Sequence, residues 1–329
     1  MKKSFILLAA AALFALAGCD LGSVEIVEPD IPVAGISLDK SSLSLAIGGV
    51  DTETLTATIE PADATNQNIT WSSNVTDVAT VDEDGVVTAT GCGTAYITAT
   101  TEDGGFTATC VVTVKIASLQ LWADGPYFAK CNVGATKAYE SGYYFWWGDT
   151  VGYKRNSEDN AWVSAGDGTT SIKFYQDDAT SAVTWGKSST VLQMTGYIDN
   201  SGNLVAAHDA ATAHMGSPWR MPTSAEFQAL ADNCDWEWKT VEGVNGYSVT
   251  GKGDYADKSI FLPAAGVGNQ SALKNAGEWG FYWSSTRYLI DEYGSDWMSY
   301  GLYLKQESIA ATDKTHRWEG FPVRAVYSE

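Results

Sequence analysis

Between Gly35 and Lys115 the chain consists of short runs in which apolar and polar residues alternate. Val, Ile and Thr dominate these runs, and the pairs Asp84-Gly85 and Asp103-Gly104 stand between them. Alternation with a period of two is typical of half-buried strands, and Asp-Gly pairs between such runs favour hairpins. The pattern predicts about seven strands, with Trp71 on a central one, folded as an all-β sandwich.

Residues 35–116 resemble the bacterial Ig-like group 2 family. The resemblance rests on the ordered blocks ISLDKSSLSLAIGG, ATIEPADAT, ITWSSNVTDVATVDEDGVVTA and GTAYITATTEDG. Members of this family act as spacers in surface proteins and adhesins, so the resemblance implies a spacer. The acidic turn from Val81 to Gly85 lacks the spaced oxygen ligands of a calcium loop and is expected to be a hairpin turn.

The N-terminus predicts export. Two lysines precede an apolar run from Phe5 to Leu16 and a small-residue cleavage site, so residues 1–18 are expected to be a signal peptide. The sequence Leu16-Ala17-Gly18-Cys19 resembles the lipobox of bacterial lipoproteins, which implies acylation of Cys19 and a lipid anchor in a membrane. An ordinary signal peptide is the alternative. Residues 19–34 would then form the lipidated N-terminus and an acidic tether.

Charge and hydropathy limit the kinds of partner and the type of membrane attachment that the chain can have. The chain carries 40 acidic and 20 basic residues, a formal net charge of −20, so its surface repels phosphate backbones and we expect no nucleic-acid partner. Past residue 18 no apolar run is long enough to span a bilayer. The expected location is the outer membrane and cell surface, as a membrane-anchored lipoprotein.

The composition changes beyond Lys115, because all but one of the 13 Trp residues lie in the second part. Thr223 and Glu226 predict a capping box at the start of a helix over 223–232, and a shorter helix is expected from Asp209 to His214, ending at Gly216. The long stretch 153–190 is expected to form mainly loops. Strands are predicted in KSIFLPAAG, GFYWSST, SYGLYLKQES and FPVRAVY.

Residues 119–329 resemble the Fibrobacter succinogenes major paralogous domain. The blocks YFAKCNVGA, DAATAHMGSPWRMPTSAEFQAL, NCDWEW, SIFLPAAG, FYWSST and GFPVRAV carry this resemblance. It implies an α+β C-type-lectin-like domain, similar in fold to formylglycine-generating enzymes and to the tips of intimin-type adhesins. The family does not fix a function.

Four cysteines remain after Cys19, and an exported protein can keep disulfides. The simplest partition gives each domain one pair, and we expect Cys131–Cys234, with free thiols as the alternative. The pair Cys92–Cys110 is less certain. A hairpin at Asp103-Gly104 would set Cys110 opposite Ile97 and leave Cys92 about five residues out of register.

The sequence offers little for catalysis. His208, His214 and His316 are the only histidines, and no metalloprotease, redox, hydrolase or phosphate-loop motif is present. We therefore expect no catalytic residue, no metal and no cofactor. The segment from Trp219 to Phe227 also resembles the scaffold of formylglycine-generating enzymes, whose chemistry depends on paired reactive cysteines. Here Arg220 and Glu226 are expected to make internal hydrogen bonds and a helix cap.

Aromatic residues in predicted loops are the candidates for ligand binding, because their large rigid faces stack on sugar rings or anchor protein partners. Core packing is the alternative for each of them, and it is the expectation for Trp219, Trp279 and Trp283. A calcium-dependent lectin is not indicated, because its Glu-Pro-Asn type of loop is missing from this domain. The candidates are Trp146, Trp147, Trp162, Trp185, Tyr288, Tyr293 and Trp297.

Together these features predict a non-enzymatic cell-surface lipoprotein that presents an adhesion domain on an Ig-like spacer. Its expected partner is a glycan or a surface protein. A structural or accessory subunit of a surface assembly is the first alternative. An enzyme on a formylglycine-generating-like scaffold is the second.

Overall fold

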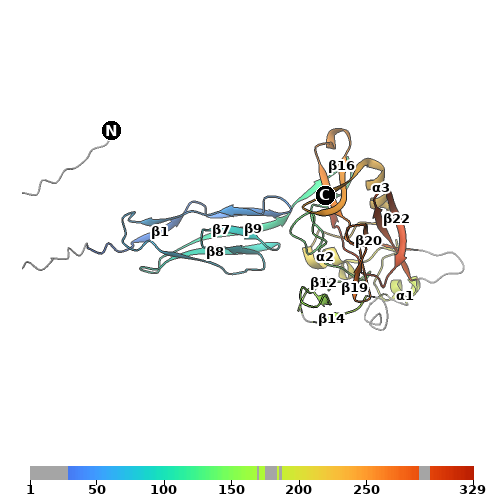
Figure 1. Cartoon of the computed structure of the whole chain (residues 1–329), viewed down its shortest axis with the longest axis horizontal. Coiled ribbons are helices and arrows are strands. Elements are labelled where there is room, and N and C mark those ends of the chain that lie inside the picture. Colours follow the sequence, from blue (N-terminus) through green and yellow to red (C-terminus); the bar gives the residue numbers. More distant parts are fainter. Residues whose placement is uncertain (1–28, 169, 175–183, 185–186, 289–296) are drawn as a thin grey trace, which may run out of the picture.

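The structure is a computed structural model that describes residues 29–168, 170–174, 184, 187–288 and 297–329. The expected signal peptide, Cys19, Trp185 and Tyr293 lie outside these residues. Figure 1 shows an elongated molecule in which a slender N-terminal domain joins a wider C-terminal domain. Within the described ranges, no helix is long and apolar enough to cross a bilayer.

The N-terminal domain is a β-sandwich. Its strands are β1 (Gly35–Leu38), β2 (Ser42–Ile47), β3 (Thr52–Thr54), β4 (Ala57–Glu60), β5 (Ile69–Ser73), β6 (Ala79–Val81), β7 (Val86–Ala89), β8 (Gly93–Thr101) and β9 (Thr107–Ile116). One sheet has the order β2-β9-β8-β5, a second has the order β3-β7-β6, and β1 pairs with β4. β2 and β9 run parallel, and the other pairs are antiparallel.

Alternate residues of the strands face the core of this sandwich. Along β9, Cys110, Val112 and Val114 are buried, while the residues between them are partly exposed. β8 and β9 pair with Cys110 opposite Ile97, the register predicted from Asp103-Gly104. The predicted all-β sandwich is therefore confirmed for this part of the chain.

The C-terminal domain contains the two predicted helices. α3 (Ser224–Asn233) begins after Thr223, which forms the expected capping box with Glu226. α2 (Ala210–Met215) is capped by the Asp209 side chain and ends at Gly216, where φ is +72°. A third helix, α1 (Ser189–Met194), and the 3-10 turns η2 (Ala206–His208) and η3 (Gly253–Tyr255) complete the helical part.

Antiparallel strands form the rest of the C-terminal domain. They are β10 (Ser118–Gln120), β11 (Tyr127–Ala129), β12 (Tyr153–Arg155), β13 (Trp162–Ser164), β14 (Ser171–Ile172), β15 (Cys234–Val241), β16 (Val244–Gly251), β17 (Ser259–Pro263), β18 (Val267–Asn269), β19 (Ala272–Lys274), β20 (Trp279–Arg287), β21 (Met298–Lys305), β22 (Ser308–His316) and β23 (Val326–Tyr327). The larger sheets are β15-β16-β17 and β20-β21-β22, and α3 lies against the second. Smaller sheets join β10-β11-β23, β12-β13-β14 and β18-β19.

The two domains share a continuous junction. Ala117 donates its N–H to Ile47 O at 2.9 Å and accepts from Lys130 N at 2.8 Å. Ile116 packs against the cores on both sides, and Cys131 and Ala135 are buried within the core of the N-terminal sandwich. Residues beyond 35–116 therefore complete the core of the first domain.

The expected disulfide between Cys131 and Cys234 is wrong. Both side chains are buried free thiols. Cys131 lies in the core of the N-terminal sandwich, whereas Cys234 lies in the core beside α3. The less certain pair is not formed either, since Cys110 is buried inside the sandwich and Cys92 is exposed. Burial raises the pKa of Cys234 to about 11, so this thiol stays protonated at neutral pH.

Candidate functional site

Three of the predicted ligand-binding tryptophans belong to the core. Trp146, Trp147 and Trp162 are 1% exposed or less. Trp146 Nε1 donates to Trp318 O at 3.0 Å, and Trp147 Nε1 donates to Ser284 O at 2.8 Å. Their predicted role in ligand binding is therefore wrong, because their faces are covered by other side chains and two of their indole N–H groups bond to backbone within the protein.

Trp297 and Tyr288 lie together at the surface. Trp297 is 42% exposed and precedes β21, and Tyr288 is half-buried just after β20. They belong to a group that we call the aromatic cluster. Its members are Tyr288, Trp297, Tyr300, Lys314, His316 and Trp318.

The pairing of β21 with β22 brings the cluster together. Tyr300 lies opposite Lys314, and Met298 lies opposite His316. The alternate pair, Ser299 and Thr315, is buried on the inner face. Because side chains of a strand alternate between faces, Tyr300, Lys314 and His316 are directed outward.

Ring contacts define two parts of the cluster. The Trp297 and Trp318 rings lie 6.1 Å apart with an interplanar angle of 53°, and His316 stacks on Trp318 at 4.1 Å and 8°. In the second part, Lys314 Nζ lies 5.0 Å from the Tyr288 ring centroid. The cluster therefore combines flat π faces with one cation.

The buried Arg317 fixes the backbone beneath the aromatic cluster. Arg317 lies between His316 and Trp318 in the chain, and its Nε donates to Met298 O at 3.1 Å and to Ser299 Oγ at 3.0 Å. Its guanidinium carbon also lies 4.8 Å from the Trp147 ring centroid. These bonds fix the backbone that carries the outward rings, so the aromatic surface is preorganised. Tyr300, Lys314, His316 and Trp318 were not among the predicted ligand-binding residues, although the pairing of Lys314 and His316 with β21 follows from a short hairpin.

The comparisons with known proteins identify the N-terminal part. Residues 32–112 match the bacterial Ig-like domain (group 2). This segment is a member of that domain family. The Ig-like domain expected from the sequence is therefore confirmed.

Several proteins of different kinds match a part of the chain. An alpha-L-arabinofuranosidase of Bifidobacterium longum subsp. longum is 43% identical over 90 residues, 27% of this chain and 8% of the enzyme. The minor capsid protein of Enterobacteria phage T3 is 45% identical over 84 residues, 26% of this chain and 18% of that protein. The chain therefore spans less than a fifth of the length of either relative.

The structural comparison is weak. One chain of a solved intimin–Tir90 complex aligns with 27% of this chain over 54% of its own length. The identity is 21% and the TM-score is 0.19.

The Ig-like domain and the aromatic cluster lie at opposite ends of the molecule. Figure 1 shows the first described residues at the end of the Ig-like domain that lies away from the C-terminal domain. β22, which ends at His316, lies on the far side of the C-terminal domain. The long axis of the molecule therefore separates the first described residues from β22, the strand that carries Lys314 and His316.

The residues considered for catalysis have structural partners. Arg220 forms two bonds of 2.8 and 2.6 Å to the Glu226 carboxylate, which also accepts from Thr223 N, as expected for an internal pair and helix cap. His214 Nε2 lies 3.0 Å from Thr150 O, and burial lowers the pKa of this imidazole. His208 stacks on Tyr197 at 3.7 Å, and burial, followed by the nearby Lys187, lowers its pKa.

Proposed function

We propose that the protein is a non-enzymatic cell-surface lipoprotein, anchored through acylated Cys19, that presents the aromatic cluster to glycans. The second domain would be C-type-lectin-like, as its resemblance to the Fibrobacter succinogenes major paralogous domain implies. The observation that carries this proposal is the position of β22, the strand that carries Lys314 and His316, on the side of the C-terminal domain away from the first described residues. A membrane anchor at residue 19 would then leave the cluster facing outward.

The junction supports this arrangement. A spacer presents a binding face best when its connection to the binding domain is stiff, because a flexible connection loses orientational freedom on binding. Here Cys131 and Ala135 of the second domain pack into the Ig-like core. The Ig-like domain therefore acts as a rigid extension of the binding domain.

The chemistry of the cluster favours sugars. Trp297 offers an exposed apolar ring at 53° to the partly buried Trp318 ring, which His316 covers on one face, and neighbouring Lys314 offers hydrogen-bond donors at the edge. The net charge of −20 repels strongly anionic polymers, so we expect neutral or weakly acidic glycans.

A glycan array with the full-length protein tests the binding function. We expect binding to a defined set of glycans and a loss of roughly 30-fold in affinity for Trp297→Ala, as for a central aromatic contact of about 2 kcal/mol. Tyr96→Ala is the matched control, since Tyr96 is a 48% exposed aromatic residue on the Ig-like domain. Absence of any glycan binding, together with co-purification of a stoichiometric protein, would favour the structural-subunit alternative instead.

Membrane fractionation tests the anchor independently. We expect the protein in the membrane fraction and Cys19→Ser in the soluble fraction, because acyl chains contribute about 0.8 kcal/mol for each buried methylene. A Cys19→Ser protein that stays in the membrane fraction would contradict lipid anchoring.

A further inference from the structure

A groove lies where the two domains meet, and the proposed glycan site does not use it. It consists of two adjoining hollows of about 260 and 220 Å³. Cys92, Ile116 and Met215 line both hollows, so they form the wall between them. We call the two hollows together the junction groove.

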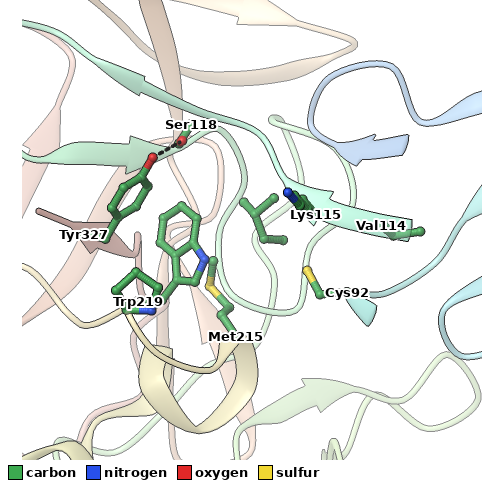
Figure 2. Close-up of a pocket in the computed structure, with 9 residues that line it drawn as sticks. Cys92, Val114, Lys115, Ser118, Met215, Trp219 and Tyr327 are labelled. Carbon is green, nitrogen blue, oxygen red and sulfur yellow. Dashed lines mark hydrogen bonds between the residues drawn. The ribbon is translucent and has the colours of Figure 1, made fainter. Parts of the chain in front are cut away.

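The first hollow has an aromatic wall. Trp219 and Tyr327 lie edge to face with ring centroids 4.9 Å apart, and Tyr327 stacks on Tyr127 at 4.9 Å and 9°. Figure 2 shows Trp219 in the middle of this wall and the hydrogen bond in which Ser118 Oγ donates to Tyr327 Oη at 3.4 Å. These contacts hold the wall in place without a ligand.

Opposite charges flank the apolar middle of the groove. The exposed Lys115 lines the first hollow, and the exposed Asp77 lines the second. Ile116 and Met215, both partly buried, lie in the shared wall. The groove is therefore apolar in the middle, cationic on one side and anionic on the other.

The size of the hollows limits the occupant. Each is smaller than the range of about 300–1,000 Å³ typical of pockets for drug-sized ligands, but together they reach it. One hollow accommodates one side chain, and the pair accommodates two neighbouring side chains of an extended segment. We propose that the junction groove binds a peptide segment of a partner protein, with two apolar side chains in the hollows, an acidic residue at Lys115 and a basic residue at Asp77.

Cys92 provides a direct readout of occupancy. It is the exposed cysteine among those that the structure describes, and it lies in the shared wall. Partial burial raises the pKa of its thiol, so its alkylation by iodoacetamide is best followed at alkaline pH. Mass spectrometry of the Cys92 peptide from the full-length protein then measures the rate of alkylation at Cys92 alone.

The probes are two end-capped peptides, Lys-Leu-Phe-Glu and Glu-Leu-Phe-Lys, which cover both chain directions, with Lys-Ser-Ser-Glu as the polar control. We expect one of the first two to slow alkylation of Cys92 in the wild-type protein, and the polar peptide to have no effect. The double variant Lys115→Asp, Asp77→Lys should prefer the other peptide. The preference should change by about fivefold for each exposed ion pair of about 1 kcal/mol.

Two apolar variants test the middle of the groove. Met215→Gln should weaken protection, while Met194→Gln should not, because Met194 is 82% exposed on α1 and lines neither hollow. Failure of both apolar peptides to protect Cys92, or an unchanged preference in the charge-reversed variant, would overturn the proposal. Protection that depends on protein concentration without peptide would also overturn it, since a second copy of the chain would then occupy the groove.

Discussion

At the scale of single residues, Gly48 shows how closely the two domains approach. Its φ is +77°, and a Cβ at this position would lie 2.7 Å from Cys131 Sγ and 3.0 Å from Lys130 Cβ. Only glycine combines this backbone conformation with the space available. The close contact between the domains therefore depends on a residue without a side chain.

We predict that Gly48→Ala destabilises the protein by about 1–3 kcal/mol more than Gly105→Ala, the cost of overpacking a filled core. Gly105 is the matched control because its φ is +63° and no atom lies within 4 Å of its Cβ position. Urea unfolding of both variants measures the difference. Equal losses of stability would show that the backbone conformation alone is responsible.

Glu226 links stability to pH. Burial by itself raises the pKa of this carboxyl, but the hydrogen bonds from Arg220 and from Thr223 N outweigh burial and hold the pKa below its ordinary value. A carboxyl with a lowered folded-state pKa adds stability above its unfolded pKa of about 4.3, and this stability is lost as the pH falls through the folded value.

We therefore expect Glu226→Gln to lower the free energy of unfolding by about 1–3 kcal/mol at pH 7. The difference from the wild-type protein should shrink as the pH falls below the unfolded pKa of about 4.3 and on through the lowered folded pKa of Glu226. Glu237→Gln, whose side chain is 73% exposed, serves as the control and should follow the wild-type curve. Unfolding curves at several pH values measure this, and a gap that stays constant down to pH 3 would refute the assignment.

At the scale of elements, short sequence motifs correctly predicted the helix starts and the strand register that neighbouring residues determine. The capping residues Asp209 and Thr223 mark the starts of α2 and α3, and the Asp103-Gly104 pair sets the register of β8 with β9. The strand β15 was not predicted, although Trp236 and Trp238 alternate with charged residues as a half-buried strand requires. β22 carries few apolar residues, and its pairing with β21 and packing against α3 make it part of the core.

The candidate site was harder to predict from the sequence, because aromatic residues in predicted loops were expected to be exposed. Trp146 and Trp147 lie in a segment with little regular structure, yet Phe145 forms a bridge with Phe321 that draws the segment into the core. Which loops are buried depends on such long-range contacts, and periodicity within the segment does not reveal them. Trp297 and Tyr288 remained at the surface, beside residues of β22 that the sequence did not connect to them.

Arg324 connects several elements of the C-terminal domain. Its buried guanidinium donates to Ala129 O, Lys130 O and Phe261 O and to the Asn132 side chain, so it links β11 and the segment after it with β17. A buried carbonyl that loses its donor costs stability, because water cannot replace the bond.

We expect Arg324→Met to destabilise the protein by about 3 kcal/mol or more, since two buried carbonyls and one part-buried carbonyl lose a donor together. Arg155→Met is the control. Among the described residues, Arg155 Nη1 donates to Ser271 O near the surface and the guanidinium carbon lies 5.2 Å from the Trp162 ring centroid, so this variant should cost about 1–2 kcal/mol. Urea unfolding followed by Trp fluorescence compares the two. A similar loss in both variants would mean that the Arg324 bonds contribute little.

At the scale of the whole molecule, the packing at the junction predicts that the two domains unfold together. Cys131 and Ala135 complete the Ig-like core, and Ile116 contacts the cores on both sides. Lys137 also forms an ion pair with Asp51 across the junction. Residues from both sides of the junction therefore complete these cores, as the proposed rigid spacer requires.

Calorimetry tests this coupling. We predict a single unfolding transition whose calorimetric and van't Hoff enthalpies agree, as for a cooperative unit. Ile116→Asn should split it into two, because an amide between the cores removes apolar contacts from both sides. Val50→Asn should leave one transition, since Val50 is an apolar residue of the Ig-like domain that is already 67% exposed. Two transitions in the wild-type protein would mean that the domains unfold independently, and the Ig-like domain would then be a flexible spacer instead of a rigid one.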